Sequence, residues 1–223
     1  MSMTAAATEA AREQMIQQQL RAWDVLDQEI LGVFARVPRE LFVPEAYAEL
    51  AFADVEIPLG GGDRMLAPKV AGRIVQAVAL KPTDRALLVG VGTGYLAACL
   101  GARACSVRGL EVREDLAALA KRNLAAAGVR NVGVEHRNAF DPEALGSGAY
   151  DVIVLGGSLP VIDERFERQL AVGGRLFAVV GSGLVMEAML IERTGPEQWR
   201  RTSLFETALK LLVGVRQPER FSF

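Results

Sequence analysis

The segment Ala86-Leu-Leu-Val-Gly-Val-Gly-Thr-Gly-Tyr95 decides the fold of this 223-residue chain. Its first half is an almost unbroken apolar run, which is typical of a parallel β-strand covered on both faces. Three glycines in the spacing G-x-G-x-G follow, and from Tyr95 the pattern becomes helical. Glycines suit a tight turn that brings the backbone close to a ligand, with the amides of the next helix pointing at it. The segment therefore predicts a strand, a ligand-binding turn at Gly90, Gly92 and Gly94, and a helix.

Strands and helices alternate beyond this segment, which predicts a doubly wound α/β sheet. The ligand crevice of such a sheet lies at the carboxyl ends of its first strands. Further strands are expected to end at Glu111 and to cover 132–136, 150–155 and 175–180, with two more in 186–223 that turn near 195–196. Helices are expected around 116–124, with a stop at Gly128, and over 163–170, followed by a turn at Gly173-Gly174.

The N-terminal residues carry a helical pattern. Apolar residues recur at helical spacing in 16–23 and again in 30–37. Asp27 is placed to cap the second of these helices, and Pro38 should end it. Pro44 suits the first turn of a short helix that runs to about residue 50. These segments predict an N-terminal helical cap.

The cap is expected to join the core through a loop. The stretch Glu56–Ala67 contains a proline and three consecutive glycines, which predicts irregular structure, and Pro68 should then open a helix. We expect one domain over 1–223, made of helical cap and loop in 1–82 and an α/β core in 83–223.

Composition narrows the class of protein. A net charge of -2 and a pI near 5.6 give no electrostatic reason to expect nucleic acid or an anionic membrane as partner. No uninterrupted apolar run reaches the length of about 18 residues that suggests a membrane span, and the N-terminus lacks the succession typical of a signal peptide. Cys99 and Cys105 have neither metal-ligand nor redox spacing. We expect inert buried thiols, a cytoplasmic location and no metal site.

Glu111 strengthens the prediction of a ligand site. An acidic residue at the end of the second strand can accept hydrogen bonds from both ribose hydroxyls. Alone, such a residue is more often a solvated strand end, but together with the glycine turn it indicates a nucleoside ligand. The turn lacks the G-x-G-x-x-G spacing of dinucleotide enzymes, so a nicotinamide oxidoreductase is the least favoured interpretation.

Several longer motifs are spread over most of the chain. Val37-Pro-Arg-Glu-Leu-Phe-Val-Pro44 and Gly62-Asp-Arg-Met-Leu-Ala-Pro68 lie in the N-terminal half, and Leu87-Leu-Val-Gly-Val-Gly-Thr-Gly-Tyr-Leu-Ala-Ala98 and Gln169-Leu-Ala-Val-Gly-Gly-Arg-Leu176 in the core. Together they resemble the protein-L-isoaspartate O-methyltransferase family, over roughly Met15 to Gly181. The resemblance implies a class I methyltransferase (Rossmann-like) fold and S-adenosylmethionine as cofactor. It also implies protein repair, in which the abnormal α-carboxyl of isoaspartyl residues in aged proteins is methylated.

The resemblance also implies which residues form the site. Cofactor contacts are expected from Gly90, Gly92, Gly94, Glu111 and Asn138, with Arg64, Met65 and Leu66 covering the transferred methyl group. S-adenosylmethionine carries no phosphate, which agrees with a glycine spacing unlike that of dinucleotide enzymes.

Several positions depart from the family pattern. The serine to which the family assigns catalysis is Leu66 here, and Arg64 stands where a threonine is usual. The acidic residue that normally faces the cofactor's amino group is Leu88, and the aspartate that takes the adenine amine is Asn138. The family's late strand near the substrate is not recognisable in Ala208-Leu-Lys-Leu-Leu212.

The departures weaken the expected site without abolishing its chemistry. A carboxylate substrate is already ionised at neutral pH, so Leu66 removes an orienting contact and not a required proton acceptor. Leu88 costs the cofactor a charge-assisted bond of roughly 1.5–3 kcal/mol, or about tenfold to a hundredfold in affinity. The amide oxygen of Asn138 can still accept from adenine. The catalytic residue stays open: Arg64 is a candidate for attracting the substrate carboxylate, although a solvent-exposed arginine is the more ordinary interpretation.

Three interpretations of function follow. The leading one is an S-adenosylmethionine-dependent carboxyl methyltransferase acting on isoaspartyl proteins or peptides. The departures favour, as an alternative, a catalytically inactive homologue that serves as a binding or interaction module. The diverged C-terminal strand favours a methyltransferase for another carboxylate. His136, the only histidine, is expected to be structural or solvated, and Phe205 and Phe221-Ser-Phe223 to dock within the chain.

Overall fold

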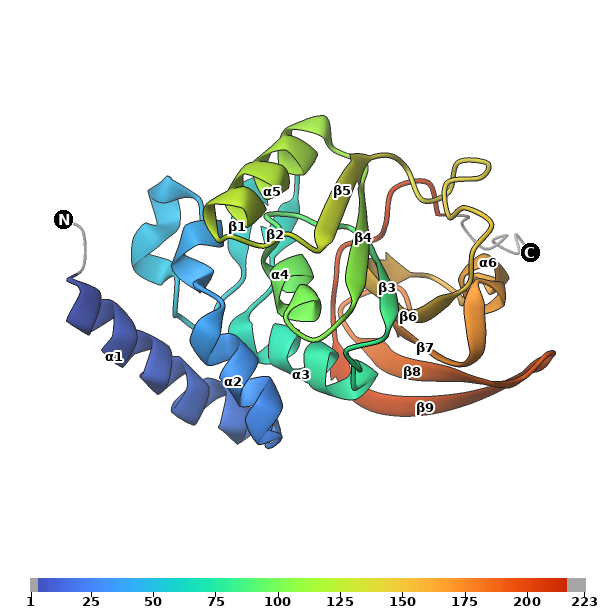
Figure 1. The fold of residues 1–223 in the computed structure, drawn as a ribbon, viewed down its shortest axis with the longest axis horizontal. Helices are drawn as coiled ribbons and strands as arrows, with labels where there is room; N and C mark the ends of the chain where they lie inside the picture. Colours follow the sequence, from blue (N-terminus) through green and yellow to red (C-terminus); the bar gives the residue numbers. More distant parts are fainter. Residues whose placement is uncertain (1–3, 216–223) are drawn as a thin grey trace.

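The computed structural model describes residues 4–215, and within that range the strands form a seven-stranded sheet in the order β5-β4-β3-β6-β7-β8-β9 (Figure 1). The strands of this sheet are β3 (Arg85–Val89), β4 (Ser106–Glu111), β5 (Val132–His136), β6 (Tyr150–Leu159), β7 (Leu170–Val180), β8 (Met186–Gly195) and β9 (Gln198–Thr207). Strands β5 to β7 run parallel, and β8 and β9 add antiparallel strands at one edge. The chain winds from β3 outward to β5 and then crosses to β6 on the other side of β3. The predicted doubly wound sheet is therefore confirmed, with its switch point between β3 and β6.

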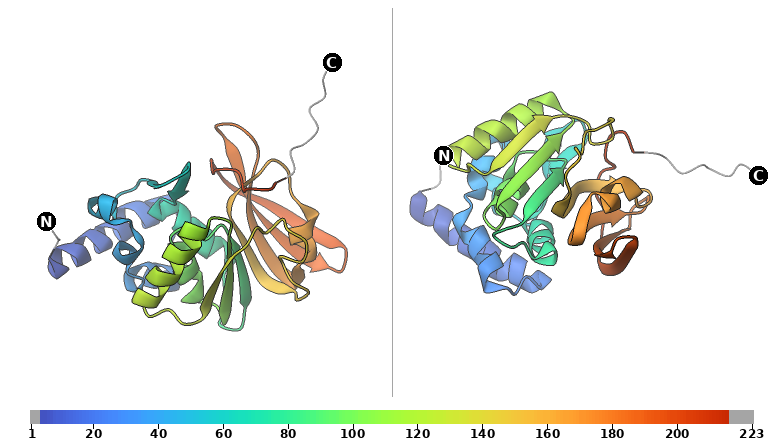
Figure 2. Two further views of the ribbon diagram at one scale, coloured as in Figure 1. Left: turned by 90° about the horizontal axis from the view of Figure 1, so that it is seen from above. Right: turned by 45° about the vertical axis from the view of Figure 1, so that its right-hand side comes forward.

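The two faces of the sheet are covered unequally. The helices are α1 (Ala5–Met15), α2 (Gln28–Arg36), α3 (Pro68–Val78), α4 (Tyr95–Gly101), α5 (Glu114–Ala126) and α6 (Glu164–Arg168). The larger core packs α3, α4, α5 and the N-terminal helices against one face, and a smaller core around Phe166 covers the other. Because side chains alternate along a strand, Leu88 points into the larger core and Leu87 into the smaller one. The N-terminal helices and the β8–β9 hairpin lie at opposite ends of the molecule (Figures 1 and 2).

The N-terminal segment forms the predicted helical cap. After α1 the chain continues through a π-helical turn (Ile16–Leu20) and a 3-10 turn (Arg21–Trp23). The Asp27 carboxylate accepts a hydrogen bond from the Glu29 amide at 2.8 Å, which caps α2 as predicted. Helix α2 ends ahead of Pro38, and 3-10 helices cover Arg39–Phe42 and Glu45–Leu50. The short helix expected after Pro44 is thus a 3-10 helix.

The expectation of a loop over Glu56–Ala67 was wrong in part. Strands β1 (Ile57–Gly60) and β2 (Asp63–Met65) pair antiparallel and form a hairpin. Gly61 and Gly62 turn its tip with φ values of +59° and +80°. Strands of four and three residues are too short to show a periodic pattern, so the glycines alone governed the prediction.

The turn expected at Gly173-Gly174 was also wrong. Strand β7 already begins at Leu170, and the register with β6 shifts between the pairs Tyr150–Leu170 and Val152–Arg175. Gly173, at φ +84°, lies in the resulting bulge inside the strand. Helix α6 is accordingly shorter than predicted. The two late strands and their turn near 195–196 are confirmed.

The two cysteines differ in exposure, and only one of them follows the prediction of a buried thiol. Cys99 is buried as predicted, but Cys105 is exposed because it lies in the turn that leads into β4. No helix within residues 4–215 has both the length and the apolar character needed to cross a bilayer.

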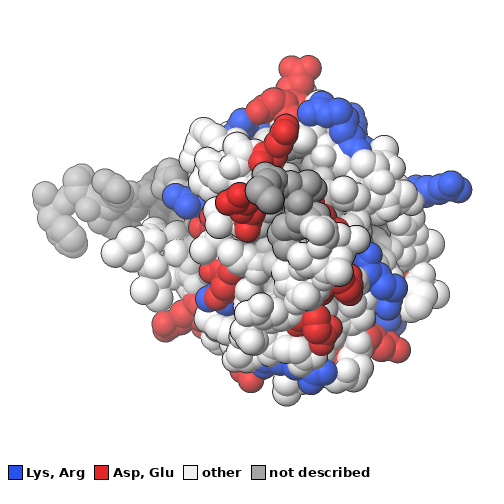
Figure 3. Space-filling view, turned by 90° about the vertical axis from the view of Figure 1, so that its left-hand side faces the viewer, with Lys and Arg blue, Asp and Glu red and all other residues white. Residues whose placement is uncertain are grey.

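On the face shown in Figure 3, acidic and basic side chains are interspersed among wide uncharged areas. Phe205 packs against Phe177 at 6.3 Å between ring centroids, so it docks within the chain, whereas Phe221-Ser-Phe223 lies outside the described residues.

Candidate functional site

The glycine turn after β3 lies at the carboxyl edge of the sheet. Gly90, Gly92 and Gly94 have φ values of +81°, +58° and +93°, a region that other residues rarely adopt. Gly90 and Gly92 line a cavity of about 320 Å³, which falls within the range of roughly 300–1,000 Å³ typical of ligand pockets. Gly94 has a different role, because a Cβ there would lie 3.3 Å from the Ala120 carbonyl oxygen. Its missing side chain lets α5 approach the turn.

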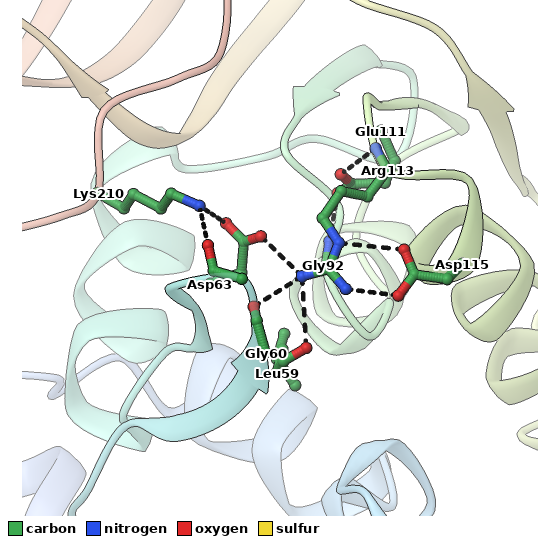
Figure 4. Close-up of polar contacts among 9 residues, drawn as sticks. Leu59, Gly60, Asp63, Gly92, Glu111, Arg113, Asp115 and Lys210 are labelled. Carbon is green, nitrogen blue, oxygen red and sulfur yellow. Dashed lines mark hydrogen bonds and ion pairs between the residues drawn. The ribbon is translucent and has the colours of Figure 1, made fainter.

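Glu111 ends β4 as predicted and lines the same cavity. The residue is 5% exposed, and its carboxylate accepts hydrogen bonds from the Gly92 amide at 2.9 Å and the Arg113 amide at 3.0 Å (Figure 4). Each oxygen takes one backbone donor and keeps a lone pair for another. The carboxylate is thus fixed in orientation and remains able to accept from two hydroxyl groups.

Two glycines inside β6, which extends beyond the strand predicted over 150–155, complete the floor of the crevice at the point where the register with β7 shifts. A Cβ on Gly156 would lie 2.4 Å from the Gly90 carbonyl oxygen, and one on Gly157 would lie 2.8 Å from Leu212 Cδ2. Both glycines line the 320 Å³ cavity. Sequence reasoning missed them, although they directly follow an apolar strand that a doubly wound sheet places beside the glycine turn.

The C-terminal segment 208–214 crosses this crevice; the family resemblance linked 208–212 with the substrate side, but no residue of the segment was predicted as a site residue. The Ser158 amide donates to the Lys210 carbonyl at 2.8 Å, and the Leu212 amide donates to the Ser158 carbonyl at 3.0 Å. The Ser158 hydroxyl donates to the Leu209 carbonyl at 2.8 Å. Through these bonds the segment pairs with the end of β6, beyond the point where β3 has ended. The segment carries no motif, so only its tertiary contacts identify it.

Asn138 lies on the far side of that segment. It lines a small cavity of about 30 Å³, and Leu212 and Val213 line both this cavity and the larger one. The Asn138 side-chain oxygen accepts from the Phe140 amide at 3.0 Å. The predicted acceptor for adenine is therefore already engaged by the backbone, with one lone pair left.

The end of β2 and the short link to α3 carry the residues expected to cover the methyl group. Met65 is buried, and the Leu66 carbonyl accepts from Arg39 Nη2 at 2.8 Å. Both residues pack in the larger hydrophobic core, and Leu66 also lines the crevice. The Arg64 side chain is 58% exposed and lies 3.8 Å from the Glu56 carboxylate. Both residues line the 320 Å³ cavity, so Arg64 lies at the crevice rim with Glu56 as its ion-pair partner.

The cap side of the glycine turn holds a buried cation. The Arg39 guanidinium lies 4.7 Å from the centroid of the Tyr95 ring, and its Nε donates to the Ala51 carbonyl at 2.8 Å. Burial lowers the pKa of Arg39, raises that of Tyr95, and raises the pKa of the Cys99 thiol to about 12. Tyr95 and Cys99 are therefore neutral at physiological pH and supply no base.

Two other candidate residues lie away from the crevice. Leu88 is fully buried in the larger core and is absent from the lining of the 320 Å³ cavity. His136 is exposed at the end of β5, where its Nε2 lies 3.1 Å from the Val112 carbonyl oxygen. His136 is thus a surface residue, as predicted.

The sheet order, the glycine turn and the acidic end of the second strand define a class I methyltransferase fold. Residues 10–209 match the family model of protein-L-isoaspartate(D-aspartate) O-methyltransferase. The chain is 36% identical over 193 residues to a protein-L-isoaspartate O-methyltransferase of Methylorubrum populi, which covers 86% of this chain and 90% of that protein. A relative from Koribacter versatilis is 35% identical over 91% of this chain and 90% of its own length. The chain belongs to the protein-L-isoaspartate(D-aspartate) O-methyltransferase family.

A solved structure supports the fold. A protein-L-isoaspartate O-methyltransferase from Plasmodium falciparum, crystallised in complex with S-adenosyl-L-homocysteine, superposes with a TM-score of 0.77. The match covers 92% of this chain and 97% of that chain at 21% identity. The likeness confirms the predicted architecture.

Proposed function

We propose that this chain transfers a methyl group from S-adenosylmethionine to the α-carboxylate of isoaspartyl residues in proteins or peptides. Family membership over most of the chain supports the reaction class. The observation that carries the proposal is the Glu111 carboxylate, held by the Gly92 amide at the carboxyl edge of the sheet and beside a cavity of ligand size. This arrangement fits a ribose with free hydroxyls.

The residues present fit the adenosine part of the cofactor. Gly90 and Gly92 would let it approach the backbone, and Glu111 would accept from the ribose. Asn138 would face the adenine, and Leu212, which lines the same small cavity, would pack against the ring. When bound, the cofactor supplies an electrophilic methyl group on a sulfonium, so the protein needs to provide alignment and exclusion of water more than proton transfer.

The acceptor side is expected to work without a catalytic base. Isoaspartyl carboxylates are ionised at neutral pH and are themselves the nucleophile. Leu66, at the position of the family serine, would shield the methyl group and orient the acceptor by contact alone. Arg64 remains the candidate for drawing the carboxylate toward the rim, since its charge is exposed there.

Two measurements test the proposal in sequence. Titration calorimetry with S-adenosylmethionine and S-adenosylhomocysteine tests the pocket, and an absence of heat and of thermal shift at millimolar ligand would favour an interaction module instead. Release of methyl ester from an isoaspartyl peptide then tests the substrate. Binding without turnover would point to another carboxylate as acceptor.

We further infer that the chain acts as one domain, in the cytoplasm, as a repair enzyme. The cap helices and the core helices share one continuous hydrophobic cluster, which supports joint folding of 1–82 and 83–223. A single calorimetric unfolding transition is expected, and two separate transitions would contradict the assignment of one domain.

A further inference from the structure

The tip of the β1–β2 hairpin has little packing of its own. At its base, Ile57 is fully buried and Met65 is 5% exposed, so the base is fixed to the core. At its tip, Gly60–Gly62 are exposed, and a Cβ on Gly60 would meet no atom within 4 Å. A two-stranded hairpin is marginal by itself. The position of the tip therefore depends on the polar contacts it makes.

Those contacts converge on Asp63. Arg113 Nη1 donates to the Gly60 carbonyl at 2.7 Å and to Asp63 Oδ2 at 2.9 Å. Lys210 Nζ donates to the Gly61 carbonyl at 2.8 Å and to Asp63 Oδ1 at 2.9 Å. Figure 4 shows the Asp63 carboxylate between the two cations, with one oxygen on each.

The two cations belong to different walls of the crevice. Arg113 follows β4 and lies two residues beyond Glu111, whose carboxylate its own amide binds. Lys210 lies in the segment that runs beside the end of β6. Asp63, Glu111 and Lys210 all line the 320 Å³ cavity between these walls. The hairpin tip thus bridges the crevice from one wall to the other.

We propose that Asp63 is a positioning residue that holds the hairpin tip closed across the crevice, and that release of Arg113 and Lys210 admits and frees the adenosine-bearing ligand. The inference rests on the proposed function, because the ligand is the cofactor named there. The side chains of Asp63, Arg113 and Lys210 are 27%, 29% and 43% exposed, and ion pairs at such exposure hold only weakly. We call these three residues the latch. Its weak ion pairs can break readily, and the glycines at the tip allow the backbone to change conformation.

The test compares exchange rates of S-adenosylhomocysteine in the full chain and its variants by stopped-flow fluorescence or surface plasmon resonance. Asp63→Asn removes the charge that both cations share. It is expected to raise the association and dissociation rates about tenfold each, while Kd changes less than about threefold. Lys210→Met should act in the same direction. Asp24→Asn is the matched control, because Asp24 is an exposed aspartate paired with Arg73 away from the crevice, so its change should leave both rates unaltered.

Salt provides a second readout, since screening weakens exposed pairs. Raising ionic strength should accelerate exchange in the wild type and have little effect in Asp63→Asn. Equal exchange rates in the wild type and in Asp63→Asn would overturn the proposal. Faster dissociation with an unchanged association rate would also overturn it, because that result would mean that Asp63 contacts the ligand directly. If the wild type binds no S-adenosylhomocysteine, the proposed function fails by itself. Amide hydrogen exchange over residues 59–66 then tests the latch: about tenfold faster exchange in Asp63→Asn but not in Asp24→Asn supports it, and equal exchange refutes it.

Discussion

The Gly92 amide donates a hydrogen bond to the Glu111 carboxylate across 2.9 Å, which joins the turn after β3 to the end of β4. Because Glu111 is almost fully buried, this bond both orients the carboxylate and holds the turn in its left-handed conformation. The ligand site and local stability therefore depend on the same contact.

Glu111→Gln tests that contact. A glutamine must turn its amide group toward one of two backbone donors, so one bond is lost and a ribose contact weakens. We expect S-adenosylhomocysteine affinity to fall about tenfold to a hundredfold, since bonds to charged groups contribute roughly 1.5–3 kcal/mol. Titration calorimetry measures the change. Glu114→Gln, an exposed change of equal charge, is the control, and equal affinities in the two variants would contradict the assignment.

Gly156→Ala tests the floor of the crevice. Its Cβ would lie 2.4 Å from the Gly90 carbonyl oxygen, so the backbone must move apart. We expect stability to fall by about 1–3 kcal/mol and ligand affinity at least tenfold. Gly133→Ala is the matched control, because a Cβ there meets nothing within 4 Å. Urea denaturation and calorimetry give the comparison, and similar behaviour of both variants would show that the approach of β6 to Gly90 is unimportant.

Leu88→Glu restores the carboxylate that the family usually has at this position. In this chain Leu88 is fully buried, so the new carboxylate costs folding free energy and its pKa should rise. A raised folded-state pKa makes the loss of stability greatest above that pKa and smaller as pH falls toward about 4. If the cofactor's ammonium lies nearby, affinity for S-adenosylmethionine should increase about tenfold. Unchanged affinity, with Leu88→Met as control, would place the ammonium elsewhere.

Arg39→Met tests the buried cation beneath the methyl-side loop. The variant leaves the Ala51 and Leu66 carbonyls without their donor, and we expect a loss of about 3–5 kcal/mol in the free energy of unfolding. Arg39→Lys should recover only part of this, because an ammonium cannot reproduce the planar fork of donors. Thermal denaturation checks both variants. Full recovery in the lysine variant would mean that charge, and not geometry, holds the loop.

The two thiols should differ in reactivity. Burial raises the pKa of Cys99 to about 12, so its thiolate is scarce at pH 8, whereas Cys105 is exposed. Ellman's reagent is expected to modify one thiol in the folded protein and two in guanidinium chloride. Two reactive thiols under native conditions would show that the helix around Cys99 opens readily.

Local sequence patterns located most regular elements of the core, but not the full extent of β6 and β7, whose bulges depend on pairing with neighbouring strands. The apolar run before Gly90, the capping Asp27 and the glycine stop after α5 each depend on residues close in sequence, whose propensities act at short range. The position of Glu111 at a strand end could be predicted for the same reason. The family motifs then indicated which ligand those elements serve.

The tertiary structure alone decided what closes the crevice. Lys210 and Leu212 lie far from the glycine turn in sequence and carry no motif, so only the packing of 208–214 against β6 brings them there. The hairpin tip acquires its position from Arg113 and Lys210, two residues that no periodic pattern connects with Asp63. Short-range propensity determines which segments become strands and helices, whereas contacts between distant segments depend on how the whole chain packs.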